Sequence, residues 1–255
     1  MEKYAAVILA AGKGTRMNSG QESFIPKVMY EIAGKPIIHH SVKLIRDAGI
    51  NEVVLVVGYQ REVIKKYFGD SVEYAIQEHQ LGTGHAAAQA RKVLKNKAES
   101  LIVFYGDNPL YKPETVKKLI SLYEREKPTI AMLSVFFENP RFWAFGRVIK
   151  DREGNVIDII EQKDCTEEEL DFAECNPGFY IFDAAWFWEN CGKLQTNNSQ
   201  KEYYLTDMIK LAAAQNKKVS CIPVSEVSEG LGINSPDQQR QAEEVLMKRG
   251  QIIIG

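Results

Sequence analysis

The sequence has few cysteines, a small net charge and no long hydrophobic run. Its four cysteines lie far apart, with neither a Cys-x-x-Cys pair nor an adjacent histidine, which argues against a zinc site and a disulfide framework: Cys165, Cys175, Cys191 and Cys221. A formal net charge of -2 gives no overall positive field for nucleic acid. The apolar run at residues 4–10 is too short for a signal sequence or a membrane span. We therefore expect a cytoplasmic protein that binds neither nucleic acid nor membranes.

The composition is that of an ordinary globular domain. Apolar residues make up 45% of the 255 residues and charged residues 26%. This length is close to the size at which a single hydrophobic core stops growing. The sequence therefore predicts one domain, residues 1–255, with an elaborated lobe.

The first half alternates strand and helix patterns. The continuous apolar runs "YAAVILA" (4–10) and "NEVVLVVG" (51–58) predict strands buried on both faces. Helical patterns follow each of them, as in "PIIHHSVKLIRDAG" and "REVIKKYF", and "VEYAIQ", "GHAAAQARKVLK" and "SLIVFYGD" continue the alternation. This order predicts an α/β fold with a doubly wound, mostly parallel, Rossmann-like sheet.

After about residue 140 the pattern changes. "FGRVIKDREGNVIDIIEQ" alternates apolar and polar residues around a polar turn, which predicts an antiparallel hairpin. "PGFYIF" and "KVSCIPV" predict strands, and "YYLTDMIKLAAAQ" predicts a helix. A last helix is expected in "SPDQQRQAEEVLMKR", capped by Ser235 with Pro236 in its first turn. We therefore expect an antiparallel lobe beside the parallel sheet.

A glycine-rich turn follows the first predicted strand. Met17 stands where the dinucleotide fingerprint requires its third glycine, and the P-loop spacing is also absent. The turn is nevertheless small and basic, since Gly12 and Gly14 allow close backbone approach while Lys13 and Arg16 carry positive charge. These residues are typical of a phosphate site or of a solvated loop, and the turn alone does not decide between them.

Asp107 stands at the carboxyl end of the predicted strand "SLIVFYGD". Open α/β sheets bind their ligands at this edge, and a carboxylate oxygen suits Mg²⁺. An aspartate before Pro109 is equally typical of a turn or a helix cap. The residue alone therefore leaves a metal ligand and a turn residue as alternatives.

Several blocks of the chain together resemble one enzyme family. "LAAGKGTRM" followed by Pro26-Lys27 is similar to the signature of the sugar-1-phosphate nucleotidyltransferases. The likeness continues along the chain in "QEHQLGTGHA", "YGDNPL", "FGRVI", "IIEQKDCTEEE", "ECNPGFYIF", "EYYLTDMI" and "GINSPDQ". The order of these blocks resembles the uridylyltransferase branch that forms UDP-N-acetylglucosamine.

The resemblance implies a reaction and a nucleotide site. The expected reaction joins UTP to N-acetyl-α-D-glucosamine 1-phosphate with release of pyrophosphate, so the expected partners are these small molecules. The resemblance places the nucleotide at Leu9, Ala10, Ala11, Gly12, Lys13, Gly14, Gln77, Gly82 and Thr83. A glutamine amide both donates and accepts hydrogen bonds, as the edge of uracil requires. The nucleotide-binding half is expected mainly in residues 1–140.

The resemblance also implies a sugar site, a metal and catalytic cations. The expected sugar-binding residues are Tyr105, Gly146, Glu161, Asn176 and Tyr204, mainly in residues 141–235, with residues 236–255 as a terminal helix and tail. The two tyrosines are also typical of a buried core. The cofactor implied is Mg²⁺, held by Asp107 and Asn234. Arg16 and Lys27 are the expected catalytic residues, because nucleotidyl transfer depends on positioning and charge neutralisation.

The chain departs from the family pattern in three places. Pro177 stands where the family has a threonine, which puts recognition of the sugar's 2-substituent in question. The segment between Arg16 and Pro26 carries an insert at residues 18–24. No hexapeptide repeats of an acetyltransferase β-helix are present, so acetyl transfer is not expected and the oligomeric state stays open.

Three alternatives to this reaction remain from the sequence. The same chemistry can use another sugar 1-phosphate, such as glucose 1-phosphate, or another nucleotide. A regulatory protein that binds nucleotide sugars without turnover is the second alternative, although such a protein need not keep both metal ligands. A glycosyltransferase is the third, but it normally carries an Asp-x-Asp motif, which Asp107-Asn108-Pro109 does not match.

Overall fold

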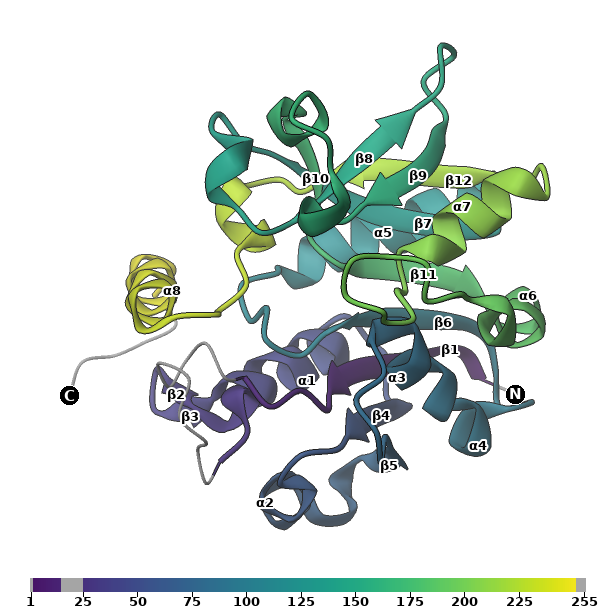
Figure 1. Cartoon of the computed structure of the whole chain (residues 1–255). Helices are drawn as coiled ribbons and strands as arrows, with labels where there is room; N and C mark the ends of the chain where they lie inside the picture. Colours follow the sequence, from purple (N-terminus) through teal and green to yellow (C-terminus); the bar gives the residue numbers. More distant parts are fainter. Residues whose placement is uncertain (1, 15–24, 251–255) are drawn as a thin grey trace.

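A computed structural model of the chain describes residues 2–14 and 25–250. Within these residues one large sheet runs through the centre of the molecule, and helices cover both of its faces (Figure 1). The predicted catalytic residue Arg16 and the insert at 18–24 lie outside the described residues.

The first half of the chain forms a parallel, doubly wound part of the sheet. Strand β1 (Glu2–Ala10) lies between β4 (Val53–Val57) and β6 (Ala98–Tyr105), and β5 (Glu73–Ile76) pairs with β4 on the outside. All of these pairs are parallel. The chain therefore moves outward from β1 in one direction and returns to β6 on its other side. Such a switch point opens a crevice at the carboxyl ends of β1 and β6.

The second half continues the same sheet with mainly antiparallel pairs. Strand β11 (Phe179–Asp183) lies antiparallel between β6 and β7 (Ile130–Phe136). Beyond β7 the order is β10 (Glu174–Asn176), β8 (Gly146–Lys150) and β9 (Val156–Ile160), while β12 (Val219–Pro223) pairs with β7 in parallel. The antiparallel β8–β9 pair confirms the predicted hairpin and the predicted lobe.

Two apolar layers hold the helices against the sheet. Ala6 and Ile8 of β1 point into a core formed with α1 (Ile37–Asp47), α2 (Arg61–Phe68) and α5 (Pro113–Glu126). The alternate residues Ala5 and Val7 point into the opposite core, with α3 (Thr83–Gln89), α4 (Arg91–Leu94), α6 (Ala184–Asn190) and α7 (Asp207–Ala214). This two-sided burial explains why the strands read as continuous apolar runs.

The last helix, α8 (Pro236–Lys248), packs away from the main cores. It lies beside the small hairpin of β2 (Glu31–Ile32) and β3 (Lys35–Pro36), as Figure 1 shows. Ser235 accepts a hydrogen bond from the Gln238 amide at 3.2 Å, which confirms the predicted cap. The packing brings α8 back to the first half of the chain.

Short 3-10 helices complete the described elements: η2 (Lys27–Met29), η3 (Gly69–Ser71), η4 (Pro140–Phe142), η5 (Gln162–Asp164), η6 (Glu169–Asp171), η7 (Cys191–Lys193) and η8 (Val227–Gly230). None of the helices in residues 2–14 and 25–250 has the length and apolarity of a membrane span.

Two predicted helix boundaries were wrong. The helix expected from Tyr203 begins at Asp207, because the backbone of Tyr203 bonds instead to Leu81 and Gly84. The single helix expected in "GHAAAQARKVLK" is divided at Ala90 into α3 and α4. Tertiary contacts override the local helical pattern at the first of these places.

Candidate active site

A cavity of about 590 Å³ opens at the carboxyl ends of β1 and β6. Every predicted site residue in the described part of the chain lines it, whatever role was assigned: Leu9, Ala10, Ala11, Gly12, Lys13, Gly14, Lys27, Gln77, Gly82, Thr83, Tyr105, Asp107, Gly146, Glu161, Asn176, Tyr204 and Asn234. The structure thus brings these residues together, and Arg16 lies outside the described residues. The volume suits a small-molecule ligand.

The two glycines of the glycine-rich turn have different surroundings. A Cβ on Gly12 would meet nothing within 4 Å, so this glycine leaves open space in the cavity. Gly14 has a φ of +67°, and a Cβ there would lie 2.3 Å from the Cβ of Lys27. Gly14 therefore allows the Lys27 stem to pack directly on the turn.

Lys27, Asp107 and Asn234 meet at one point of the cavity. The Lys27 ammonium group forms an ion pair with the Asp107 carboxylate and donates to the Asn234 amide oxygen at 2.8 Å. The Lys27 and Asp107 side chains are only 13% and 23% exposed. Two hard oxygen atoms therefore converge on one cation, and such a pair suits Mg²⁺, which completes its shell with phosphate and water.

Backbone contacts bring Asn234 to Asp107 from the far end of the chain. The Ile233 amide donates to the Asp107 carbonyl at 2.9 Å. The neighbouring Asn108 side chain, oriented to satisfy its surroundings, donates to the carbonyls of Glu229 and Leu231. The segment that follows β12 is thereby fixed against the end of β6.

The residues predicted to read the base are held by internal hydrogen bonds. The Gln77 amide nitrogen donates to the Gly82 carbonyl at 3.1 Å and lies 2.9 Å from His85 Nδ1. The Gln77 amide nitrogen is thereby engaged within the chain, and its oxygen is the group left to accept. Gly82 has a φ of +113°, and a Cβ there would lie 2.5 Å from the Tyr203 carbonyl oxygen, so close backbone packing explains this glycine. Thr83 accepts a hydrogen bond from the Leu205 amide at 2.9 Å.

The turn at Asn176 lies under Tyr105. Asn176 accepts a hydrogen bond from the Gly178 amide at 3.1 Å and donates to the Tyr180 hydroxyl at 2.6 Å. A Cβ on Gly178 would lie 2.1 Å from the Tyr105 ring. Burial raises the pKa of Tyr105 far above its usual range, so its hydroxyl stays protonated. The bonds to Gly178 and Tyr180 use one acceptor position and one donor of the Asn176 amide, which is half of its hydrogen-bonding capacity.

Glu161 and Gly146 face each other across the hairpin end. The Thr206 hydroxyl donates to Glu161 at 3.0 Å. Burial raises the pKa of the Glu161 carboxyl, and the Thr206 hydrogen bond opposes this shift. A Cβ on Gly146 would lie 2.7 Å from Ile159 and 3.6 Å from the Glu161 carboxylate. Close packing against Ile159 therefore explains this glycine, which lies beside the Glu161 carboxylate.

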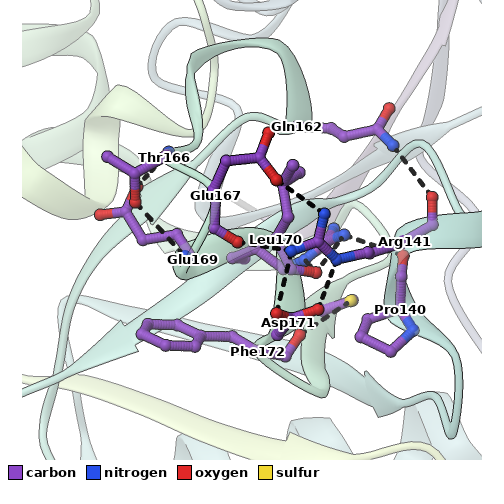
Figure 2. Close-up of polar contacts among 11 residues, drawn as sticks. Pro140, Arg141, Gln162, Thr166, Glu167, Glu169, Leu170, Asp171 and Phe172 are labelled. Carbon is purple, nitrogen blue, oxygen red and sulfur yellow. Dashed lines mark hydrogen bonds and ion pairs between the residues drawn. The ribbon is translucent and has the colours of Figure 1, made fainter.

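A network of two arginines fixes the walls of this part of the cavity. Figure 2 shows Arg141 between Glu167 and Asp171, which accept hydrogen bonds from its guanidinium group at 2.8 and 2.9 Å. Arg147 is fully buried and donates to the backbone carbonyls of Pro140 at 2.8 Å and Leu170 at 3.2 Å, and to that of Phe145. The network joins the segment before β8 to the segment after β9.

Replacing Arg147 by methionine is expected to lower the free energy of unfolding by about 2 kcal/mol, because the buried carbonyls lose their donor. Urea unfolding measures this difference. Arg152→Met is the matched control, since Arg152 is exposed in the hairpin turn and is expected to tolerate the change. Equal stability of the two variants would contradict the structural role of Arg147.

Asp207 gives the chain a predicted pH dependence. Burial raises the pKa of its carboxyl from 3.8 to about 6, the charge of Asp158 adds to the shift, and Lys210 opposes it. The native state therefore binds more protons than the unfolded state between about pH 4 and pH 6, so stability falls as the pH rises through this window.

Asp207→Asn removes the ionisable carboxyl and with it the loss of stability between about pH 4 and pH 6. We expect it to be more stable than the original chain by about 1 kcal/mol at pH 7.5, after allowance for screening by solvent, with the difference shrinking at pH 4. Urea unfolding midpoints at both pH values test this, with the exposed Asp237→Asn as control. A stability difference between Asp207→Asn and the original chain that is the same at both pH values would contradict the raised pKa of Asp207.

The cavity is also lined by residues that the sequence analysis did not name as site residues: Val28, Gln80, Ala86, Asn108, Ala144, Phe145, Gln200, Glu202 and Gly232. Pro177, where the chain departs from the family pattern, lines it as well. Gln200 donates to the Tyr204 hydroxyl at 2.8 Å and accepts from Lys163 at 2.6 Å. Most of these residues are close sequence neighbours of predicted ones, and this proximity was the available signal.

The doubly wound sheet and its cavity define a nucleotide-binding type of α/β protein, and comparison with known proteins identifies the family. Residues 6–148, more than half of the chain, match the MobA-like NTP transferase domain. The chain belongs to this nucleotidyltransferase family, as the sequence blocks predicted.

Curated relatives cover nearly the whole chain. It is 44% identical over 246 residues to the bifunctional protein GlmU of Clostridium novyi, a match that covers 96% of this chain and 52% of the relative. It is 38% identical over 251 residues to the bifunctional protein GlmU of Geotalea daltonii, with 98% and 54% covered. The chain thus spans about half the length of the curated relatives that it matches.

Solved structures share the fold at lower identity. A UDP-glucose pyrophosphorylase in complex with UDP-glucose superposes with a TM-score of 0.79 at 20% identity, covering 98% of this chain and 100% of that one. A putative glucose-1-phosphate thymidylyltransferase from Bacillus anthracis superposes with a TM-score of 0.77 at 18% identity, covering 99% and 97%. These likenesses confirm the predicted Rossmann-like fold.

Proposed function

We propose that the chain is an Mg²⁺-dependent uridylyltransferase that converts UTP and N-acetyl-α-D-glucosamine 1-phosphate into UDP-N-acetylglucosamine and pyrophosphate. The observation that carries the proposal is the convergence of a lysine, a carboxylate and an amide oxygen on the wall of one cavity. The choice of uridine and of this sugar rests on the resemblance of the sequence blocks to the uridylyltransferase branch.

The nucleotide is proposed to lie between the glycine-rich turn and Gln77. Gly12 leaves room for phosphates, and Lys13, whose ammonium group lies 5.9 Å from the centre of the Tyr59 ring, adds positive charge at the rim. The free oxygen of Gln77 accepts the imino N–H of uracil. A cytosine ring nitrogen at the same position offers no proton, so uridine is preferred.

The sugar phosphate is proposed to lie at the end formed by Gly146, Glu161 and Tyr204. Glu161 accepts hydrogen bonds from sugar hydroxyl groups, and Gly146 presents no side chain beside it. The remaining donor of Asn176 contributes one contact, because its other donor bonds to Tyr180.

The chemistry is a direct displacement. An oxygen of the sugar phosphate attacks the α-phosphorus of UTP, the bond to the β-phosphate breaks, and pyrophosphate leaves. Asp107 and Asn234 would hold the Mg²⁺, which would neutralise charge on the phosphates. Lys27 and Arg16 are proposed to stabilise the same charge from the glycine-rich side.

Glucose 1-phosphate is a second candidate for the sugar substrate. Pro177 favours it, because this residue has neither a side-chain hydroxyl nor a backbone N–H for an acetamido group. The carbonyl of Pro177 is also engaged, since it accepts the Tyr111 hydroxyl at 2.9 Å.

Pyrophosphate release from a panel of four nucleoside triphosphates and several sugar 1-phosphates tests the proposal. We expect UTP with N-acetylglucosamine 1-phosphate to give the highest kcat/KM. A higher value with glucose 1-phosphate would select the second candidate. Negligible release from every pair would instead favour a regulatory protein that binds nucleotide sugars.

A further inference from the structure

We propose that Lys27 and a divalent cation compete for the same position between Asp107 and Asn234. The ammonium group of Lys27 contacts both oxygen atoms, so it lies where a cation shared by these two side chains would lie. The inference rests on the metal site of the proposed function. It adds that the Lys27 ammonium group occupies this site when no metal is bound. The lysine therefore weakens metal binding to the free protein.

The packing of Lys27 supports this position. Its stem lies on Gly14, where any Cβ would overlap it, and Pro26 directly precedes it with φ -62° and ψ 148°. The start of the side chain is thus fixed, while the ammonium group can rotate about the remaining bonds of the stem. Lys27 can leave the two oxygens without displacement of its backbone.

Charge makes the two arrangements exclusive. A single carboxylate and one amide oxygen cannot stabilise an ammonium group and a divalent cation at the same place, because like charges in a partly buried site repel. Lys27 therefore turns away when the two oxygens bind a metal. Its fixed stem on Gly14 directs the released ammonium group toward the glycine-rich turn, where the triphosphate is proposed to lie.

This exchange gives Lys27 two successive roles. Before substrate arrives, it neutralises Asp107 and keeps Asp107 and Asn234 at the spacing of a shared cation. Once released, it adds positive charge beside the phosphates. Binding of the metal to Asp107 and Asn234 therefore releases the Lys27 ammonium group, which then contacts the nucleotide phosphates.

Mn²⁺ titration of the full chain without nucleotide, followed by electron paramagnetic resonance of the free ion, tests the competition. Lys27→Met keeps the stem on Gly14 but removes the ammonium group, and it is expected to bind one Mn²⁺ about tenfold more tightly than the original chain. Lys27→Arg keeps a positive charge and is expected to show no such gain. Lys43→Met removes one charge from an exposed pair with Asp47 and should bind as the original chain does.

The double variant Lys27→Met with Asp107→Asn locates the effect. The gain in Mn²⁺ affinity is expected to disappear in it, and Mn²⁺ should raise the melting temperature of the single variant more than that of the original chain. Unchanged or weaker Mn²⁺ binding by Lys27→Met would overturn the inference, as would a gain that persists in the double variant. Pyrophosphate release by the original chain reports the proposed function separately, so the two failures are distinguishable.

Discussion

Replacing Asp107 by asparagine is expected to lower kcat by about 10²–10³-fold with UTP and a sugar 1-phosphate. The carboxylate supplies the negative charge for the proposed metal and for Lys27, and asparagine keeps its size but not its charge. Steady-state pyrophosphate release measures the loss.

Asp70→Asn is the matched control for this change, because Asp70 is exposed in η3 and away from the cavity. We expect its kcat to match that of the original chain. The thermal stability of Asp107→Asn shows whether the variant is folded. A folded Asp107→Asn that keeps more than about a third of the original kcat would exclude Asp107 from the catalytic site.

Gly178→Ala is expected to lower the free energy of unfolding by about 2–5 kcal/mol. Gly178 has a φ of +81°, which an alanine adopts at a cost of about 1–2 kcal/mol. Its new Cβ would also lie 2.1 Å from the Tyr105 ring, and overpacking of this kind adds about 1–3 kcal/mol. Because Tyr105 lines the cavity, its displacement should also raise KM for the sugar phosphate.

Gly154→Ala separates the two effects. Gly154 has a similar φ of +86° in the hairpin turn, but a Cβ there would meet nothing within 4 Å. We expect this control to lose only the backbone part, about 1–2 kcal/mol, with unchanged KM values. If urea unfolding shows the same decrease in the free energy of unfolding for Gly178→Ala and Gly154→Ala, overlap with Tyr105 does not contribute to the effect.

The sequence predicted the parallel half of the fold well because its strands are buried on both faces. β1 and β4 read as continuous apolar runs, and each lies between two partner strands. It did not predict the helix start at Asp207, because the backbone of Tyr203, where the helix was expected to begin, forms hydrogen bonds with Leu81 and Gly84. No local pattern carries that contact, because these residues are more than a hundred positions apart.

The site residues could be named from sequence, but the reasons for several of them could not. Gly14 was expected to allow a phosphate to approach the backbone. In the structure, a side chain at this position would overlap the Lys27 stem, which explains the glycine. Gln77 was expected to donate and accept toward a base, yet its nitrogen is engaged by Gly82 and His85. Such roles depend on side chains that meet only in the folded chain.

Phosphorus NMR follows the proposed transfer of the nucleotide to a sugar phosphate directly. The full chain is incubated with UTP, N-acetylglucosamine 1-phosphate and Mg²⁺. We predict loss of the sugar phosphate signal, equal gains of the two coupled diphosphate signals of a nucleotide sugar, and a pyrophosphate signal whose gain equals the sum of those two, because its two phosphorus atoms are equivalent. An unchanged sugar phosphate signal, or release of inorganic phosphate in place of pyrophosphate, would contradict the proposed nucleotidyl transfer.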